Sequence, residues 1–297
     1  MGRKSGSGSL TVRDLDGIDE FRQAVAFQES VWGRGFSERV PASLMKVTRR
    51  LGGVVASAFD PGGEMVGFVY GMTGPEDGRL IHWSDILAVK TGLRDRGVGR
   101  LLKRFQREQV LARGITLMRW TFDPLESRNA YLNLRHLGAV VREYAVDMYG
   151  VSDSPLHRGL GTDRYVVSWE LDSPRVVSRI TGEGAPKPEA FAALEEAFPV
   201  EPSAAGPAPG AVPTDAQVQE LLRRSADAGG LRLPIPADIQ SLRDRDPGIA
   251  GSWRRATRAV LDPALGQGWE VRELLPPGPE SPPVSHTVLT PPSPHQR

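Results

Sequence analysis

Hydrophobic and polar positions between residues 10 and 172 follow two alternating patterns. Short apolar or alternating runs, typical of strands, and apolar residues spaced three to four apart, typical of amphipathic helices, are separated by glycine or proline. The pattern predicts strands at 10–15, 54–59, 65–71, 79–89 and 116–122, and helices at 19–31, 42–51 and 98–114. The order β-α-α-β-β-β-α-β predicts an α/β (α+β) fold, a mixed and mostly antiparallel sheet flanked by helices.

The chain is organised around residues 86–114, where a strand, a basic glycine-rich turn and a helix follow one another. The strand ends in Leu87-Ala88-Val89, the turn contains Arg94, Arg96, Gly97, Gly99 and Arg100, and the helix face comprises Val98, Leu101, Leu102 and Phe105. A glycine turn at a helix start leaves backbone N–H groups unpaired, and the helix dipole favours negative charge there. We expect a pyrophosphate cradle, the alternative being a tight turn with solvated arginines.

The turn lacks the Gly-Lys-Ser/Thr of a Walker A loop and the third glycine of the dinucleotide fingerprint. It resembles motif A of the GNAT (general N-acetyltransferase) superfamily of acyl-CoA-dependent N-acyltransferases, Q/R-x-x-G-x-G/A after a strand ending in Leu-Ala-Val. The resemblance implies that acetyl-CoA or another acyl-CoA is bound by the turn and by backbone amides at the strand end. The implied cofactor-binding residues are Leu87, Val89, Arg94, Arg96, Gly97, Val98, Gly99 and Arg100.

A helix predicted at 127–138 resembles motif B of the same family, with Asn129 nine residues before Gly138. Many members carry a tyrosine four residues before this glycine, where it can protonate the CoA thiolate, but this chain has Leu134. Tyr131, nearly one turn earlier, is the candidate acid, with core packing as the alternative. Asn129 and Asn133 are candidate pantetheine ligands or solvated polar residues. With predicted strands at 140–149 and 164–171, the resemblance covers about residues 10–172.

The strand at 79–89 supplies the candidate bases, because family members usually project such groups from this strand. Strand alternation places Trp83, Asp85 and Leu87 on one face and His82 and Ser84 on the other, unless a bulge exchanges the faces. Asp85 is the leading base or ammonium ligand, and an ordinary ion pair is its alternative. His82 is the second candidate, because imidazole titrates near neutrality.

Trp83 and two arginines near the last strand, Arg158 and Arg164, are the candidate acceptor-binding residues. An arginine at that place can hold the carboxylate of an amino-acid acceptor with two parallel hydrogen bonds. An ion pair that closes the loop before the last strand is the alternative for both arginines.

Composition excludes several classes of function. The 297 residues include 37 Lys and Arg against 36 Asp and Glu, a net charge of +1, so no global field attracts nucleic acid or an anionic membrane. Cysteine is absent, and the five histidines show no metal-ligand spacing, so no metal is expected. No apolar run approaches the roughly 20 residues of a membrane span. We expect a cytoplasmic protein, and a homodimer stays open.

The remaining residues are less regular and suggest five segments. Residues 1–9 are expected to form a flexible arm, 10–175 the acyltransferase domain, and 176–213 a connecting segment ending in a Pro/Ala-rich linker. A small α/β extension is expected at 214–275, starting with a capping box at Thr214 and Gln217. The Pro/Ser-rich residues 276–297 are expected to be disordered.

The resemblance therefore implies an acyl-CoA-dependent N-acyltransferase that moves an acetyl or succinyl group directly to a primary amine within a ternary complex. The expected acceptor is a small molecule such as an amino acid. Two alternatives stay open. The first is a catalytically silent CoA sensor or scaffold, motivated by Leu134 and by the Pro-rich segments. The second is a protein N-acetyltransferase, for which the chain shows no acidic cluster that would hold a basic tail.

Overall fold

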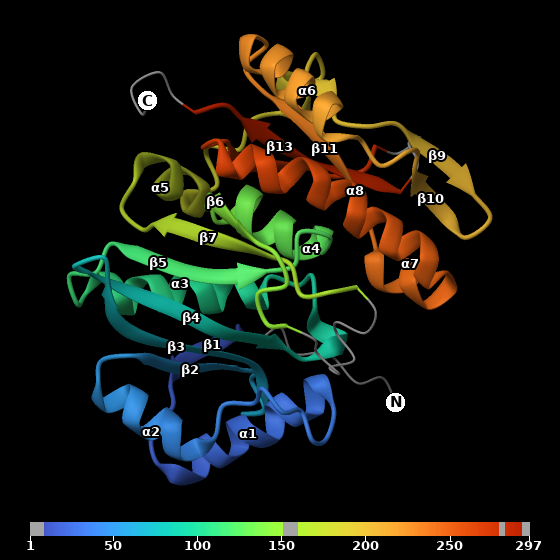
Figure 1. Ribbon diagram of the computed structural model, residues 1–297. Coiled ribbons are helices and arrows are strands. Elements are labelled where there is room, and N and C mark those ends of the chain that lie inside the picture. The colour runs from blue at the N-terminus through green and yellow to red at the C-terminus, as the bar shows by residue number, and fades with distance from the viewer. Residues whose placement is uncertain (1–8, 151–159, 279–282, 293–297) are drawn as a thin grey trace. The chain divides into compact units, whose positions relative to one another are not determined.

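The computed structural model describes residues 9–150, 160–278 and 283–292, and it divides into two compact units, Met1–Trp120 and Thr121–Arg297. The first unit contains the β-α-α-β-β-β-α-β series (Figure 1). Its strands are β1 (Thr11–Asp14), β2 (Val54–Phe59), β3 (Met65–Glu76), β4 (Arg79–Val89) and β5 (Leu117–Phe122), the last running two residues into the second unit. The predicted order is confirmed.

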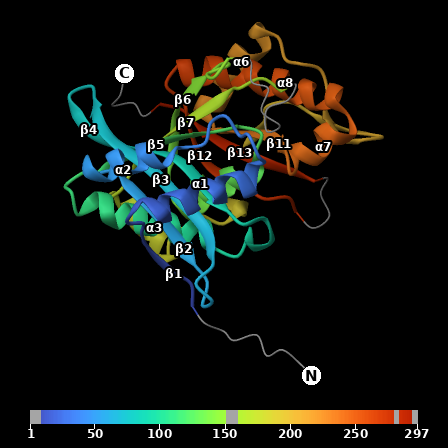
Figure 2. The same cartoon turned by 90° about the horizontal axis from the view of Figure 1, so that it is seen from below.

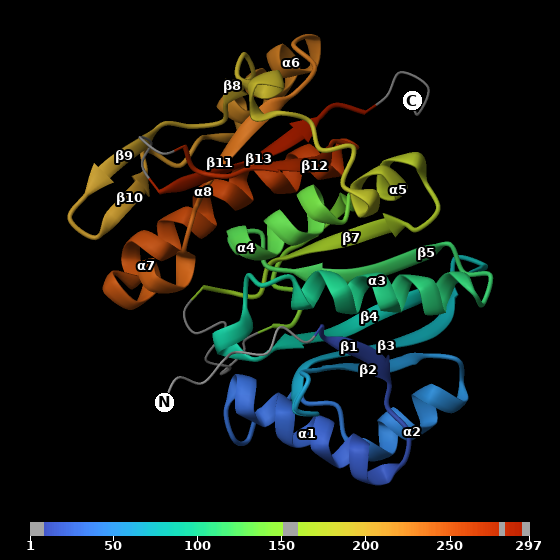
Figure 3. The ribbon, with the colours of Figure 1, turned by 180° about the vertical axis from the view of Figure 1, so that it is seen from behind.

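The sheet of the first unit has the order β1-β2-β3-β4-β5. Neighbours from β1 to β4 are antiparallel, and β5 lies parallel to β4. Helices α1 (Ile18–Trp32) and α2 (Ala42–Arg50) pack on one face, as the view from below shows (Figure 2), and α3 (Val98–Leu111) packs on the other (Figure 3). A short 3₁₀ turn, η1 (Thr91–Leu93), connects β4 toward α3.

Opposite faces of the sheet bury different residues because side chains alternate along each strand. Phe68 and Tyr70 of β3 pack with Phe21 and Met45 under α1 and α2. Gly67 faces α3 instead, where an added Cβ would lie 2.8 Å from Leu102 Cδ1 and 2.9 Å from Val98 Cγ1. A glycine at this position lets α3 approach the sheet closely.

The second unit begins with α4 (Ser127–Ala130), which continues as a π-helix, η2 (Tyr131–His136). Its main sheet has the order β7-β6-β12-β13-β11-β8. The strands are β6 (Val140–Ala145), β7 (Arg164–Glu170), β8 (Glu195–Glu196), β11 (Leu231–Pro236), β12 (Glu270–Leu275) and β13 (Val284–Thr290). The helices are α5 (Pro174–Thr181), η3 (Pro188–Phe191), α6 (Asp215–Asp227), α7 (Ile239–Arg245) and α8 (Pro247–Gly266). The capping box of Thr214 and Gln217 is present at the start of α6.

The tail prediction was wrong for part of residues 276–297. Strand β13 lies there and pairs on one side with β11 and on the other with β12, with Ser285 and Thr287 fully buried. The Pro/Ser-rich composition hid a run of β-branched and apolar residues, Val284 to Thr290, whose strand is stabilised by two neighbours distant in sequence.

The segment at 176–213 is also more ordered than a linker. It contains most of α5, then η3, β8 and the hairpin of β9 (Val200–Ser203) and β10 (Gly206–Pro209). The expected boundary near 175 does not separate two sheets, because β12 of the extension pairs with β6 at Val271↔Val141. The expected arm at 1–9 lies almost wholly outside the described residues.

Candidate active site

The predicted cradle lies at the start of α3. Gly97 is its N-cap residue with φ 81°, a left-handed conformation that glycine adopts without strain. No side chain caps this end, so the amides of Val98 and Gly99 at the helix start receive no side-chain cap. Arg94 and Arg96 are exposed beside it, and Arg100 is half-buried on the first turn. The arrangement presents N–H donors and mobile positive charge to an anion.

The strand before the cradle has a free edge. The ladder between β4 and β5 comprises His82↔Met118 and Trp83↔Arg119 in the described ranges, although β4 continues to Val89. The amide of Lys90 donates to Val66 O across β3, at 3.0 Å. Because successive amides of a strand point to opposite edges, the N–H groups of Leu87 and Val89 point away from β3. Two backbone donors are thus open to an extended ligand, at the residues that the resemblance indicates.

A β-bulge changes the predicted faces of β4. Ile86 pairs with Tyr70 and Ser84 with Gly71, so Asp85 is the extra residue. Leu87 pairs with Val69 and so shares the face of Ser84, which pairs with Gly71. The expected placement of Trp83, Asp85 and Leu87 on one face is therefore wrong, because the bulge exchanges the faces beyond Asp85. The bulge re-aims this side chain, which stays open to solvent while Trp83 and Leu87 are half-buried. Although the side chain is exposed at the surface, the protein atoms around it partly exclude water from the carboxyl. This partial desolvation raises the pKa of Asp85, and the Glu38 carboxylate raises it further.

His82 is fully buried, and both ring nitrogens already have partners. Nδ1 lies 3.1 Å from Thr73 Oγ1 and Nε2 lies 3.1 Å from Gln106 Nε2. Burial, with smaller contributions from charge repulsion by Lys103 and Arg113, lowers the pKa of His82 to about 3. The ring is neutral and enclosed, so the structure does not present it to a substrate as the sequence analysis expected.

The motif B residues belong to the second unit. Asn129 is exposed, whereas Asn133 and Leu134 are buried. Tyr131 is half-buried at the start of the π-helix, with its ring 4.8 Å from that of His136 in an edge-on contact. The π-helix widens this turn, a feature that frequently marks functional positions. Asn129 is thus accessible, Tyr131 is partly accessible, and Asn133 is enclosed.

The two predicted acceptor arginines differ in outcome. Arg158 lies outside the described residues. Arg164 is buried, donates to Asp163 O at 2.9 Å, and lies 3.9 Å from Asp123 and above the Tyr149 ring. These contacts match the alternative of an ion pair, and they leave little of Arg164 for an acceptor carboxylate.

Sequence reasoning missed a buried polar cluster on the inner face of α3. Lys103 is 2% exposed and Gln106 is fully buried, together with Ser84 of β4. The predicted helix face contained Leu101 and Phe105, but Leu101 is 40% exposed. The missed signal was the spacing of Val98, Leu102, Gln106 and Val110, four residues apart, all of which are buried.

Comparisons with known proteins find similarity in solved structures alone. No family model matches the chain, and no curated protein matches it. A GNAT-family acetyltransferase from Streptococcus pneumoniae is 18% identical, with a TM-score of 0.44 over 54% of this chain and 98% of its own. The ribosomal-protein-S18-alanine N-acetyltransferase from Escherichia coli is 13% identical, with a TM-score of 0.43 over 56% of this chain and 96% of its own.

The order of elements from β1 to β7 is the order that the sequence predicted. At TM-scores below 0.5 the structural likenesses carry no argument of their own. The functional inference therefore depends on this chain's own residues: the glycine turn, the free edge of β4 and the bulge at Asp85.

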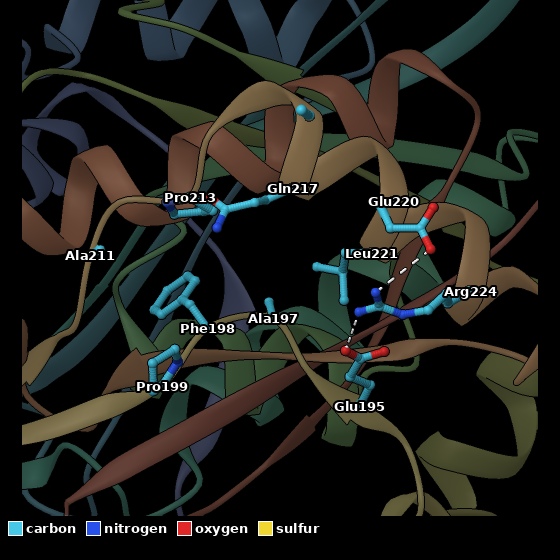
Figure 4. A pocket seen from close by; sticks show the side chains of 11 residues that line it. Glu195, Ala197, Phe198, Pro199, Ala211, Pro213, Gln217, Glu220, Leu221 and Arg224 are labelled. Carbon is cyan, nitrogen blue, oxygen red and sulfur yellow. Dashed lines mark hydrogen bonds and ion pairs between the residues drawn. The ribbon is translucent and has the colours of Figure 1, made fainter.

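A cavity of about 630 Å³ lies in the second unit (Figure 4). Phe198 and Leu221 line it, and Arg224 at its edge pairs with Glu195 and Glu220. None of the predicted site residues lines it. In the described ranges no helix has the length and apolar character needed to cross a membrane, and no group of three or more side chains could hold a metal ion.

Proposed function

We propose that this chain is an acyl-CoA-dependent N-acyltransferase, which transfers an acetyl or succinyl group to the primary amine of a small molecule. The observation that carries the proposal is the uncapped start of α3 at Gly97, placed after a strand whose Leu87 and Val89 amides are open. A pyrophosphate fits the first feature and a pantetheine amide chain fits the second. Together they match one extended ligand, acyl-CoA.

The residues of the cradle fit the phosphates by chemistry. The first-turn amides donate to phosphate oxygens, and Arg94 and Arg96 reach them from solvent, where guanidinium groups form bidentate contacts. Leu87 and Val89 donate backbone hydrogen bonds that align the pantetheine along β4. Binding along a strand edge fixes the depth at which the thioester carbonyl lies relative to the bulge.

Asp85 is the residue proposed to act on the amine. An amine attacks the thioester carbonyl carbon only when it is neutral, so its ammonium form must lose a proton. The raised pKa of Asp85 brings this carboxyl nearer to the pH at which it accepts that proton and passes it to solvent. A C–N bond forms, the C–S bond breaks, CoA leaves as a thiolate, and the nitrogen releases its second proton to solvent. Tyr131 is the candidate donor of a proton to this thiolate.

The acceptor is proposed to be a small amine such as an amino acid, and the protein is proposed to act in the cytoplasm without metal. Asp85 is an anionic group at the acceptor side, and it suits an ammonium. A peptide N-terminus carries the same ammonium, so acceptors of both kinds belong in one screen. Whether the protein forms a homodimer is to be measured.

The test is release of the CoA thiol from acetyl-CoA and succinyl-CoA in the presence of amino acids, polyamines and peptides. We expect turnover with at least one amine, and a loss of about 10²- to 10⁴-fold in kcat for Asp85→Asn, the range for removal of a general base. Acyl-CoA affinity stays unchanged in Asp85→Asn, and the exposed control Asp172→Asn behaves as wild type. Binding of acyl-CoA without turnover of any amine would instead support the sensor alternative.

A further inference from the structure

A chain of buried polar groups crosses the first unit beneath the β4 bulge. Lys103 Nζ lies 2.7 Å from Ser84 Oγ and 3.3 Å from Gln106 Oε1, and Ser84 Oγ lies 2.9 Å from Gln106 Oε1. Gln106 Nε2 then reaches His82 Nε2, and His82 Nδ1 reaches Thr73 Oγ1, both at 3.1 Å. Four of these five side chains are less than 5% exposed. The chain links α3 to β4 and β3.

Chemistry fixes the direction of every hydrogen bond. An amide oxygen only accepts, so the Ser84 hydroxyl donates to Gln106 Oε1, and Lys103 must donate to Ser84. The Gln106 amide donates to His82 Nε2, which leaves the proton of the neutral ring on Nδ1. Nδ1 donates to Thr73, and the Thr73 hydroxyl donates to Gly52 O at 3.4 Å. All donors point from Lys103 toward Gly52.

This chain is a poor path for protons, because a carboxamide in its middle neither releases nor accepts a proton readily. Its effect is geometric. A series of aligned, satisfied hydrogen bonds in an apolar interior holds its members in one arrangement. The member that bears on the site is Ser84, because it directly precedes Asp85.

Lys103 also holds the second strand. Its Nζ lies 3.9 Å from the centroid of the Trp120 ring and 4.0 Å from Met118 Sδ, both on β5. Pairing of β4 with β5 ends at Trp83↔Arg119, so the amine lies where β4 begins its free edge. In the described part of the chain, no carboxylate pairs with Lys103. The view from behind shows α3 lying across β4 and β5 (Figure 3). A single amine on the cradle helix thus contacts both strands at this point.

We propose that Lys103 is a positioning residue that, through Ser84, sets the β4 bulge and hence the Asp85 carboxylate relative to the cofactor cradle on α3. This inference rests on the proposed acyltransferase function. Lys103 touches neither substrate nor cofactor, because its side chain is enclosed. Its loss therefore displaces the reacting groups without removing any of them, and misplacement by about 1 Å can cost about 100-fold in rate.

The experiment compares Lys103→Met, Ser84→Ala, their double variant and the exposed-lysine control Lys187→Met in the full chain. Methionine fills the space of the lysine stem, and Ser84 can still donate to Gln106, so no buried donor loses its partner. For Lys103→Met we expect a kcat about 10- to 100-fold lower, with acetyl-CoA Kd and Tm close to wild type. The double variant should lose no more than Lys103→Met alone, since both act through one contact.

Other results overturn the inference in distinguishable ways. A wild-type kcat in Lys103→Met, or a loss that follows only the fraction unfolded, shows a structural role alone. If wild type neither binds acetyl-CoA nor turns over, the proposed function fails and the catalytic role of Lys103 fails with it. The ¹⁵N imidazole signal of His82, assigned by its absence in His82→Asn, then still tests whether Lys103 is coupled to His82 through the buried hydrogen bonds. We expect an Nδ1–H tautomer in wild type, and a tautomer or shift unaffected by Lys103→Met would refute the coupling.

Discussion

Two buried cations, one in each unit, are held in opposite ways. Lys103 of the first unit is 2% exposed and is surrounded by neutral acceptors, and burial lowers its pKa well below the usual range. Arg254 of the second unit is 4% exposed, and burial alone would lower its pKa. The Asp123 carboxylate at 2.5 Å, together with Asp163 and Tyr144, raises it overall. Burial without a neighbouring anion lowers the pKa of a cationic group and so destabilises its charged form. A neighbouring anion in the same buried place stabilises the charged form.

The second unit extends this ionic pattern. Arg258 lies 2.5 Å from Asp163, which is fully buried and also accepts from the Tyr144 hydroxyl. Burial raises the pKa of Asp163, but the hydrogen bonds from Arg258, Tyr144 and the Asp147 amide and the charge of Arg254 together outweigh burial, so the net shift is downward. These pairs tie α8 to residues 123–163 within the unit. The ion pairs of Arg254 and Arg258 with Asp123 and Asp163, the ionic cluster, are suited to stabilise the fold. The hydrogen-bonded series from Lys103 to Thr73, the neutral chain, is suited to set the exact position of a site.

The largest expected effect comes from breaking the ionic cluster. Arg254→Met leaves the largely buried Asp123 carboxylate with the Leu125 amide and the more distant Arg164, 3.9 Å away, and should lower the free energy of unfolding by about 3–5 kcal/mol. Arg255→Met, its exposed neighbour, is the matched control and should change stability by less than about 0.5 kcal/mol. Urea unfolding measures both. Equal effects of the two substitutions would contradict the importance of the Asp123 pair.

A smaller effect on the free energy of unfolding is expected when the pH is lowered, because His82 of the neutral chain resists protonation. The folded-state pKa of His82 is about 3 against an ordinary value of 6.5, so the unfolded state binds the proton more readily. Its stabilising contribution is complete above pH 6.5 and falls by about 1.4 kcal/mol for each pH unit below that, about 2 kcal/mol by pH 5. Unfolding free energies between pH 7 and 5 should slope less in His82→Gln. Identical slopes would show that His82 is not the neutral, enclosed group described.

The smallest effect sharpens the comparison. Replacing a buried, unpaired amine by an apolar side chain of similar volume is expected to be neutral or stabilising, so Lys103→Met should change the free energy of unfolding by less than about 1 kcal/mol. The same denaturant curves provide the measurement. A loss comparable to that of Arg254→Met would mean that Lys103 holds the first unit together and would remove the contrast with the second.

Sequence alone predicted the parts of the molecule that depend on local pattern. The order of elements from β1 to β7 follows from the spacing of apolar residues. Gly97 at the start of α3 has a left-handed conformation, for which glycine is the best suited residue. The Leu87 and Val89 amides point away from β3 because alternation holds beyond the bulge, and their role in binding pantetheine stays a prediction.

What the sequence could not predict depends on partners distant along the chain. The bulge at Asp85 arises from the register of β4 against β3, and a one-residue insertion leaves no mark in composition. From sequence alone, a lysine such as Lys103 is expected to be solvated, and its burial depends on the packing of α3 on the sheet. Likewise Arg164 lies beside the distant Asp123 through a tertiary contact, and β13 is stabilised by two strands that lie earlier in the sequence.

The most direct test of the account is calorimetric titration of the full chain with acetyl-CoA, succinyl-CoA and free CoA. It should be repeated on Arg94→Ala/Arg96→Ala and on the equally charged control Arg104→Ala/Arg255→Ala, whose arginines are exposed elsewhere. The account predicts saturable binding that weakens at least about tenfold in the cradle variant, since each charged hydrogen bond contributes about 1.5–3 kcal/mol, and stays unchanged in the control. Absence of binding to every thioester, or equal weakening in both double variants, would contradict the assignment of the α3 start as the acyl-CoA cradle.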